Sequence, residues 1–168
     1  MSRLPPDSLA FALLQAARIH LAVLGGQSLA DGQLGRVEAI ARPAVQDLVY
    51  GSLRRYGRGD FLLGQLLSHP LTAEDIRCLL LVALYRLETR PEAAHTVVDQ
   101  AVRAAGELAG GRFGGLVNGV LRNYLRREAE LLAALAADPL AGSQHPAWWL
   151  AELQRAHPEN WPAIVAAG

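Results

Sequence analysis

Residues 75–87, DIRCLLLVALYRL, are the stretch that decides the fold. On a helical projection their apolar side chains cover most of the circumference, and the basic residues Arg77 and Arg86 bracket the apolar run. A helix that is apolar nearly all round is buried among other helices. At about 1.5 Å per residue the stretch spans roughly 20 Å, which is shorter than a bilayer core of about 30 Å. We therefore expect a buried central helix at about 75–87 with other helices packed around it.

The composition indicates a soluble protein with a real core. The chain has 168 residues, of which 51% are hydrophobic, and this is enough apolar surface to bury. The formal net charge is zero, and all 16 basic residues are arginine. The single cysteine, Cys78, excludes an intramolecular disulfide and fits a reducing compartment. Because we find neither a secretory signal nor a long apolar run, we expect a cytoplasmic protein with no membrane partner.

Apolar residues recur at helical spacing along most of the chain, and no stretch shows convincing strand periodicity. The pattern predicts an all-α bundle of seven to nine helices. Asp7 or Ser8 is expected to begin the first helix, and Glu128 is expected to bend the last long one, because it stands where the apolar stripe should continue. The expected helices are 10–24, 42–58, 61–67, 75–87, 97–108 and 113–135, with two short ones at 147–156 and 159–167.

Polar residues suggest where three of these helices begin. Asp60 is expected to cap the helix at 61–67. Thr72 with Asp75, and Thr96 with Asp99, have the spacing of a capping box with Asp in place of the usual Glu. These pairs predict the starts of the central helix and of the helix at 97–108.

Residues able to carry catalysis or hold a metal are scarce. Cys78 lies in the most apolar helix, where a cysteine behaves as a small hydrophobe and its pKa would rise. The glycine-rich turn at 106–115 lacks the register of a nucleotide-binding loop. We therefore expect a binding module with no catalytic residue, metal or cofactor of its own. The histidines also lack metal-ligand spacing; they are His20, His69, His95, His145 and His157.

Two groups of arginines are the candidates for binding RNA. Arginine binds phosphate bidentately and stacks on bases. No acidic residue lies between Arg112 and Arg127, so a basic face is expected there even though the chain is neutral overall. The alternative interpretation is a solvated helix face. The candidates are Arg54, Arg55 and Arg58 in one group, and Arg112, Arg122, Arg126 and Arg127 in the other.

Four stretches together resemble a known family. They are VQDLVYGSLRRYGRGDFLLGQLL (45–67), LLLVALYRLETRPEAAHTVVDQAV (79–102), GLVNGVLRNYLRR (115–127) and HPAWWLAELQRAHPENWPAIVAAG (145–168). In this order and spacing they resemble the N-terminal NusB-like domain of the RsmB/Sun/Fmu family of 16S rRNA cytosine-C5 methyltransferases. The resemblance implies a NusB-like helical domain at 1–138, followed at 139–168 by a linker and the first helices of the connection to a catalytic domain.

The resemblance also implies what the longer parent protein does. Members of the family transfer a methyl group from S-adenosylmethionine to carbon 5 of a cytosine, using a cysteine that adds to the base. That cysteine and the cofactor loop belong to a catalytic domain whose motifs do not occur here, and Cys78 matches neither family cysteine. The residues that match family positions are Gly51, Leu53 and Arg54 of YGSLRR, and Asn118 and Arg122 of VNGVLR.

We therefore expect an RNA-binding, substrate-positioning domain whose partners are 16S rRNA and the parent's own catalytic domain. The alternative is a protein-interaction module, which docks the catalytic domain or a ribosomal or transcription partner in the manner of an antitermination factor. Trp148, Trp149 and Trp161 favour docking for the C-terminal part. Neither the pattern nor the resemblance fixes the oligomeric state.

Overall fold

The computed structural model describes residues 2–27 and 32–138, and it confirms an all-α fold. The expected linker and helices at 139–168 lie outside the described residues. No strand occurs in the two described ranges. The helices are α1 (Leu9–Leu24), η2 (Leu34–Arg36), α2 (Arg42–Arg54), α3 (Tyr56–Leu66), α4 (Glu74–Thr89), η3 (Pro91–Ala93), α5 (Ala94–Ala105), η4 (Ala109–Gly111), α6 (Gly114–Arg126) and α7 (Glu128–Ala136).

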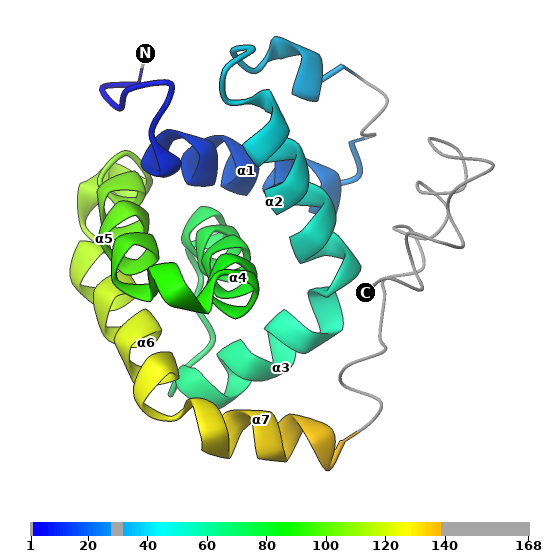
Figure 1. The fold of residues 1–168 in the computed structure, drawn as a ribbon, viewed down its shortest axis with the longest axis vertical. Coiled ribbons are helices and arrows are strands. Elements are labelled where there is room, and N and C mark those ends of the chain that lie inside the picture. The colour runs from blue at the N-terminus through cyan, green and yellow to red at the C-terminus, as the bar shows by residue number, and fades with distance from the viewer. Residues whose placement is uncertain (1, 28–31, 139–168) are drawn as a thin grey trace, which may run out of the picture.

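The central helix of the fold is α4, as its sequence predicts. Figure 1 shows α4 surrounded by α1, α2, α3, α7, α6 and α5, and α4 contacts all of these except α7 closely. Nearly every side chain from Ile76 to Leu87 is buried, and the exceptions are Arg77 and Arg86. Because the apolar residues leave no polar face, the helix needs neighbours on all sides. The ring of helices supplies them.

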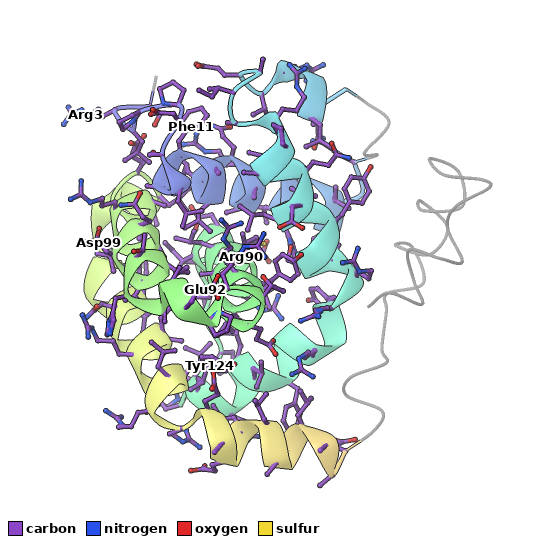
Figure 2. The ribbon with its side chains drawn as sticks, viewed as in Figure 1. Arg3, Phe11, Arg90, Glu92, Asp99 and Tyr124 are labelled. Atoms are coloured by element: carbon purple, nitrogen blue, oxygen red, sulfur yellow. The ribbon has the colours of Figure 1, made fainter. Side chains whose placement is uncertain are left out.

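The bend expected at Glu128 is confirmed. The backbone leaves helical geometry at Arg127, where φ is −104° and ψ is 14°, and it separates α6 from α7. Before the break, α6 buries Val117, Leu121 and Tyr124. In Figure 2 Tyr124 lies inside the ring of helices, whereas Arg3 points away from the body. The break lets α7 turn and pack on α3.

One of the predicted caps is confirmed and three are wrong. The Ser8 hydroxyl accepts a hydrogen bond from the Phe11 amide at 3.1 Å and caps α1. No side chain caps α4, whose N-cap is Ala73, or α5, whose N-cap is Ala93. Asp60 lies inside α3 rather than before it.

The structure shows what the expected capping residues do instead. The long helix expected at 42–58 ends at Arg54, so α3 begins four residues before Asp60, which is free to bind the Arg77 guanidinium instead. The turn η3 leads directly into α5, so the helix begins before Thr96. In the expected Thr72–Asp75 capping box, the Asp75 carboxylate instead accepts from the amide of the next residue, Ile76, at 2.8 Å.

Candidate nucleic-acid interface

The two predicted arginine groups lie on different sides of the molecule. Arg54, Arg55 and Arg58 are at the junction of α2 and α3, and Arg122 and Arg126 are on α6. Figure 1 shows α2 and α3 on one side of α4 and α5 and α6 on the other. The seven arginines therefore make two separate surfaces, which have to be judged separately.

The first surface, which we call the α6 face, consists of Arg122 and Arg126 on α6 and of Arg112, two residues before that helix begins. All three side chains are exposed. The Nε of Arg122 donates to Asn118 Oδ1 at 2.9 Å, and an Nη of Arg126 donates to Asn123 Oδ1 at 2.6 Å. The asparagine amides are neutral, so they orient two guanidinium groups without cancelling their charge. The α6 face is therefore positive, open to solvent and partly ordered.

Arg127, the fourth arginine of that group, is engaged within the protein. Its guanidinium pairs with Glu130 at 2.6 Å and donates to the Gln65 carbonyl at 3.2 Å. The hydrogen bond from Arg127 lowers the pKa of Glu130, which therefore stays ionised beside it. We exclude Arg127 from the α6 face because its charge is already balanced.

Arg58 is held in the same way on the other side of the molecule. Its Nε donates to Glu88 Oε2 at 2.7 Å, and an Nη lies 2.6 Å from the same oxygen. The Glu88 side chain is only 9% exposed, so this acid depends on its partner for stabilisation. A pair of this kind is costly to break because one charge is left half-buried.

Arg54 and Arg55 lie beside Tyr85, where α2 and α4 approach closely. A Cβ at Gly51 would lie 2.0 Å from the Tyr85 Cζ, so only glycine permits this approach. The Tyr85 hydroxyl donates to Asp47 Oδ1 at 2.8 Å, and the Arg55 Cζ lies 5.6 Å from the centre of the Tyr85 ring. The tyrosine is therefore fixed between the two helices.

The comparison with protein families agrees with this architecture. A family model described as the NusB family matches residues 10–126, which reach from α1 through α6. The chain belongs to the NusB family. The match covers both the central helix and the two arginine surfaces, and it leaves the 139–168 stretch outside.

Curated relatives of this NusB-family chain carry the name ribosomal RNA small subunit methyltransferase B. The protein from Pseudomonas putida KT2440 is 39% identical over 160 residues, and that from Pseudomonas syringae pv. tomato DC3000 is 38% identical over 160 residues. The protein from Escherichia coli O6:H1 is 33% identical over 159 residues. Each match covers 92% of this chain but only 36–37% of the relative.

Buried polar chemistry in the NusB-family fold is structural. His20 is fully buried, and its Nδ1 lies 2.9 Å from the Ser52 Oγ. Burial lowers the pKa of His20 to about 3, so the imidazole is neutral at pH 7. Cys78 is 1% exposed, and burial raises the pKa of its thiol to about 12, which confirms its sequence-based assignment to the core.

Neither a metal centre nor a membrane span is seen in the described residues. Residues 2–27 and 32–138 contain no group of three or more His, Cys, Asp or Glu side chains placed to hold a metal ion. Each helix within those ranges is too short or too polar to cross a membrane.

Sequence reasoning missed part of the surface between α2 and α4. Arg86 lies 3.9 Å from Asp47, the residue that accepts from the Tyr85 hydroxyl. Tyr85 and Asp47 are 38 positions apart in the sequence, so periodicity alone does not bring α2 and α4 together here. The glycine in YGSLRR was the available signal, because a glycine inside a helix often marks a close approach.

Proposed function

We propose that the chain is the RNA-binding and substrate-positioning domain of an S-adenosylmethionine-dependent methyltransferase that modifies carbon 5 of a cytosine in 16S rRNA. The domain spans 1–138, and 139–168 connects it to the catalytic part of a cytoplasmic parent protein. The names of the relatives and the ordered sequence resemblance support the parent's class. The chain spans little more than a third of those relatives' length, so the domain's task is a part of the whole activity.

The observation that carries the RNA-binding proposal is the α6 face. Its three arginines are exposed, and no acidic residue interrupts the sequence between Arg112 and Arg127. Exposed guanidinium groups without acidic partners neutralise phosphates and release counterions. Two of the three are also oriented by asparagines, which lowers the entropy lost on binding.

S-adenosylmethionine belongs to the parent's catalytic domain in this proposal. The described residues do not fit the family's covalent chemistry, which needs a cysteine thiolate. Cys78 is buried inside α4 and its pKa is raised to about 12, so it does not provide that nucleophile. No step of methyl transfer is therefore assigned to the residues of this chain.

The test is binding of the full chain to a 16S rRNA hairpin and to an unrelated RNA of equal length across a salt series. We expect affinity for both RNAs to fall linearly on a log-log plot, because phosphate neutralisation dominates. A preference for the 16S hairpin would add recognition of shape or unpaired bases. Absence of binding to either RNA at low salt would refute the proposal.

The second candidate function is docking of the parent's catalytic domain. The observation that favours it is in the sequence, where all three tryptophans fall between positions 148 and 161. Tryptophan is enriched in the energetic centres of protein interfaces. Binding of the chain to the separate catalytic domain, with no binding to RNA, would favour this function over the first.

A further inference from the structure

We propose that Arg54, Arg55 and Arg86 form a receptor for a single RNA phosphate on the side of α4 that faces α2. This arginine receptor rests on the proposed RNA-binding function and names a contact distinct from the α6 face. Its frame is the contact between α2 and α4, and its ligand class is a phosphodiester with two free oxygens.

The frame of the receptor is rigid because the Tyr85 side chain of α4 packs directly on the backbone of α2. Gly51 lets the Tyr85 ring lie against the α2 backbone, and the Tyr85 hydroxyl donates to Asp47. The Arg55 guanidinium lies over the Tyr85 ring, with its Cζ 5.6 Å from the ring centre. Arg54 and Arg55 both act electrostatically on the Tyr85 hydroxyl, which places their charges near it.

The three arginines have unused hydrogen-bond donors. The Nε atoms of Arg54, Arg55 and Arg86 are shielded from solvent, and they have no hydrogen-bond partner within the part of the chain that the structure describes. Buried polar groups are normally paired, and an unpaired one costs free energy. An oxyanion bound among these side chains would satisfy them.

Charge points to the same ligand. The three guanidinium groups are half-buried, and the carboxylate of Asp47 is already engaged: its Oδ1 accepts from Tyr85 and its Oδ2 is 3.9 Å from Arg86. The second nearby acid, Glu88, is taken by Arg58. The cluster therefore keeps an excess of positive charge where water screens it poorly. A guanidinium group can donate two parallel hydrogen bonds to two oxygens of a phosphate, whereas an ammonium group acts as a point charge.

The two surfaces differ in what they can recognise. The α6 face is open, so it attracts any phosphate backbone. The arginine receptor is half-buried and fixed, so it accepts a phosphate that projects from the RNA strand. A phosphodiester in a bent or unpaired RNA segment projects in this way, and such segments are the usual targets of specific RNA recognition.

The experiment titrates the full chain with UpU, which has one phosphodiester, and follows the arginine Nε–H signals by NMR. Uridine is the control without phosphate, and a glutamate-containing tetrapeptide tests a protein carboxylate. We expect UpU to shift the Nε–H signals of Arg54, Arg55 and Arg86, assigned from single variants, whereas uridine and the peptide leave them in place. Shifts with the peptide and none with UpU would overturn the RNA assignment, as would a lack of shifts with every probe.

Two variants make the test independent of folding. Asp47→Asn keeps an acceptor for the Tyr85 hydroxyl and removes the competing charge, so UpU affinity should rise about threefold. Arg86→Lys keeps the charge and loses the fork, so affinity should fall about tenfold. A purely structural role predicts no gain from Asp47→Asn, and that result would overturn the receptor.

Failure of the receptor can be told from failure of the proposed function. If the hairpin binds with a steep salt dependence while UpU leaves the three Nε–H signals unchanged, the receptor is wrong and RNA binding stands. If UpU shifts these signals but no RNA hairpin binds at low salt, the proposed RNA-positioning function is wrong. The three arginines then bind a phosphodiester, and the assignment of the receptor to RNA is overturned as well.

Discussion

The α6 face and the α2–α4 junction contain the same residue type in opposite settings. On the α6 face, Arg112, Arg122 and Arg126 are exposed, and Arg122 and Arg126 donate to neutral asparagines. At the junction, arginines are half-buried, stacked on a tyrosine or paired with an acid. The first setting keeps charge available for any phosphate, and the second fixes geometry for one. A count of arginines in the sequence does not separate these roles.

The largest expected effect is a loss of stability where Tyr85 of α4 packs on Gly51 of α2. Gly51→Ala places a Cβ 2.0 Å from the Tyr85 Cζ, so we expect the free energy of unfolding to fall by about 2–3 kcal/mol. The matched control is Gly119→Ala on α6, where a Cβ would meet nothing within 4 Å. That change should raise stability by about 0.5–1 kcal/mol. If urea denaturation shows that both changes alter the free energy of unfolding equally, the close approach at Gly51 does not distinguish the α2–α4 contact from α6.

Acid should lower the free energy of unfolding through His20, the residue of α1 that bonds to Ser52 of α2. Burial lowers the pKa of His20 to about 3, so between pH 6.5 and 3 the unfolded chain binds a proton that the folded chain does not. Stability is therefore full above pH 6.5 and falls with acid, by up to about 1.4 kcal/mol per pH unit.

Urea denaturation from pH 7 to pH 5 measures this contribution. Replacing His20 by glutamine should flatten the dependence relative to the unmodified chain, by about 2 kcal/mol over the window. The control is His95→Gln, since His95 is exposed on α5. If the two variants show the same pH dependence, His20 is not the group responsible.

The Arg58–Glu88 pair decides whether Arg58 is available to RNA. Glu88→Gln removes the partner of a half-buried guanidinium, so we expect a loss of about 1–2 kcal/mol in unfolding free energy. The control is Glu92→Gln in η3, where the acid is exposed. An unchanged stability in Glu88→Gln would return Arg58 to the set of free RNA-binding arginines.

Much of the fold follows from the sequence. The apolar circumference of 75–87 predicts the buried central helix, and the misplaced Glu128 predicts the break after α6. The wrong caps show the limit of local patterns: Asp60 has the chemistry of a cap but binds Arg77 on another helix. Likewise, the spacing of Arg58 says nothing of Glu88, 30 residues away. Long-range partners decide these roles, and periodicity does not contain them.

The smallest expected effect comes from the asparagine that orients Arg122. Asn118→Ala removes the acceptor of the Arg122 Nε, and we expect RNA affinity at low salt to fall about threefold. Asn118→Asp should lower affinity further, because a carboxylate would cancel the charge of Arg122. If Asn118→Asp binds RNA as well as the unmodified chain, Arg122 does not contact the RNA.

The α6 face itself is tested most directly by the salt dependence of RNA binding in matched charge variants. In one variant Arg112, Arg122 and Arg126 become glutamine, in a second they become lysine, and Arg103→Gln on α5 is the control because Arg103 is paired with Asp99. We expect the glutamine variant to reduce the log-log slope by about 2–3, and the lysine variant and the control to keep it. An unchanged slope in the glutamine variant would contradict the assignment of RNA binding to α6.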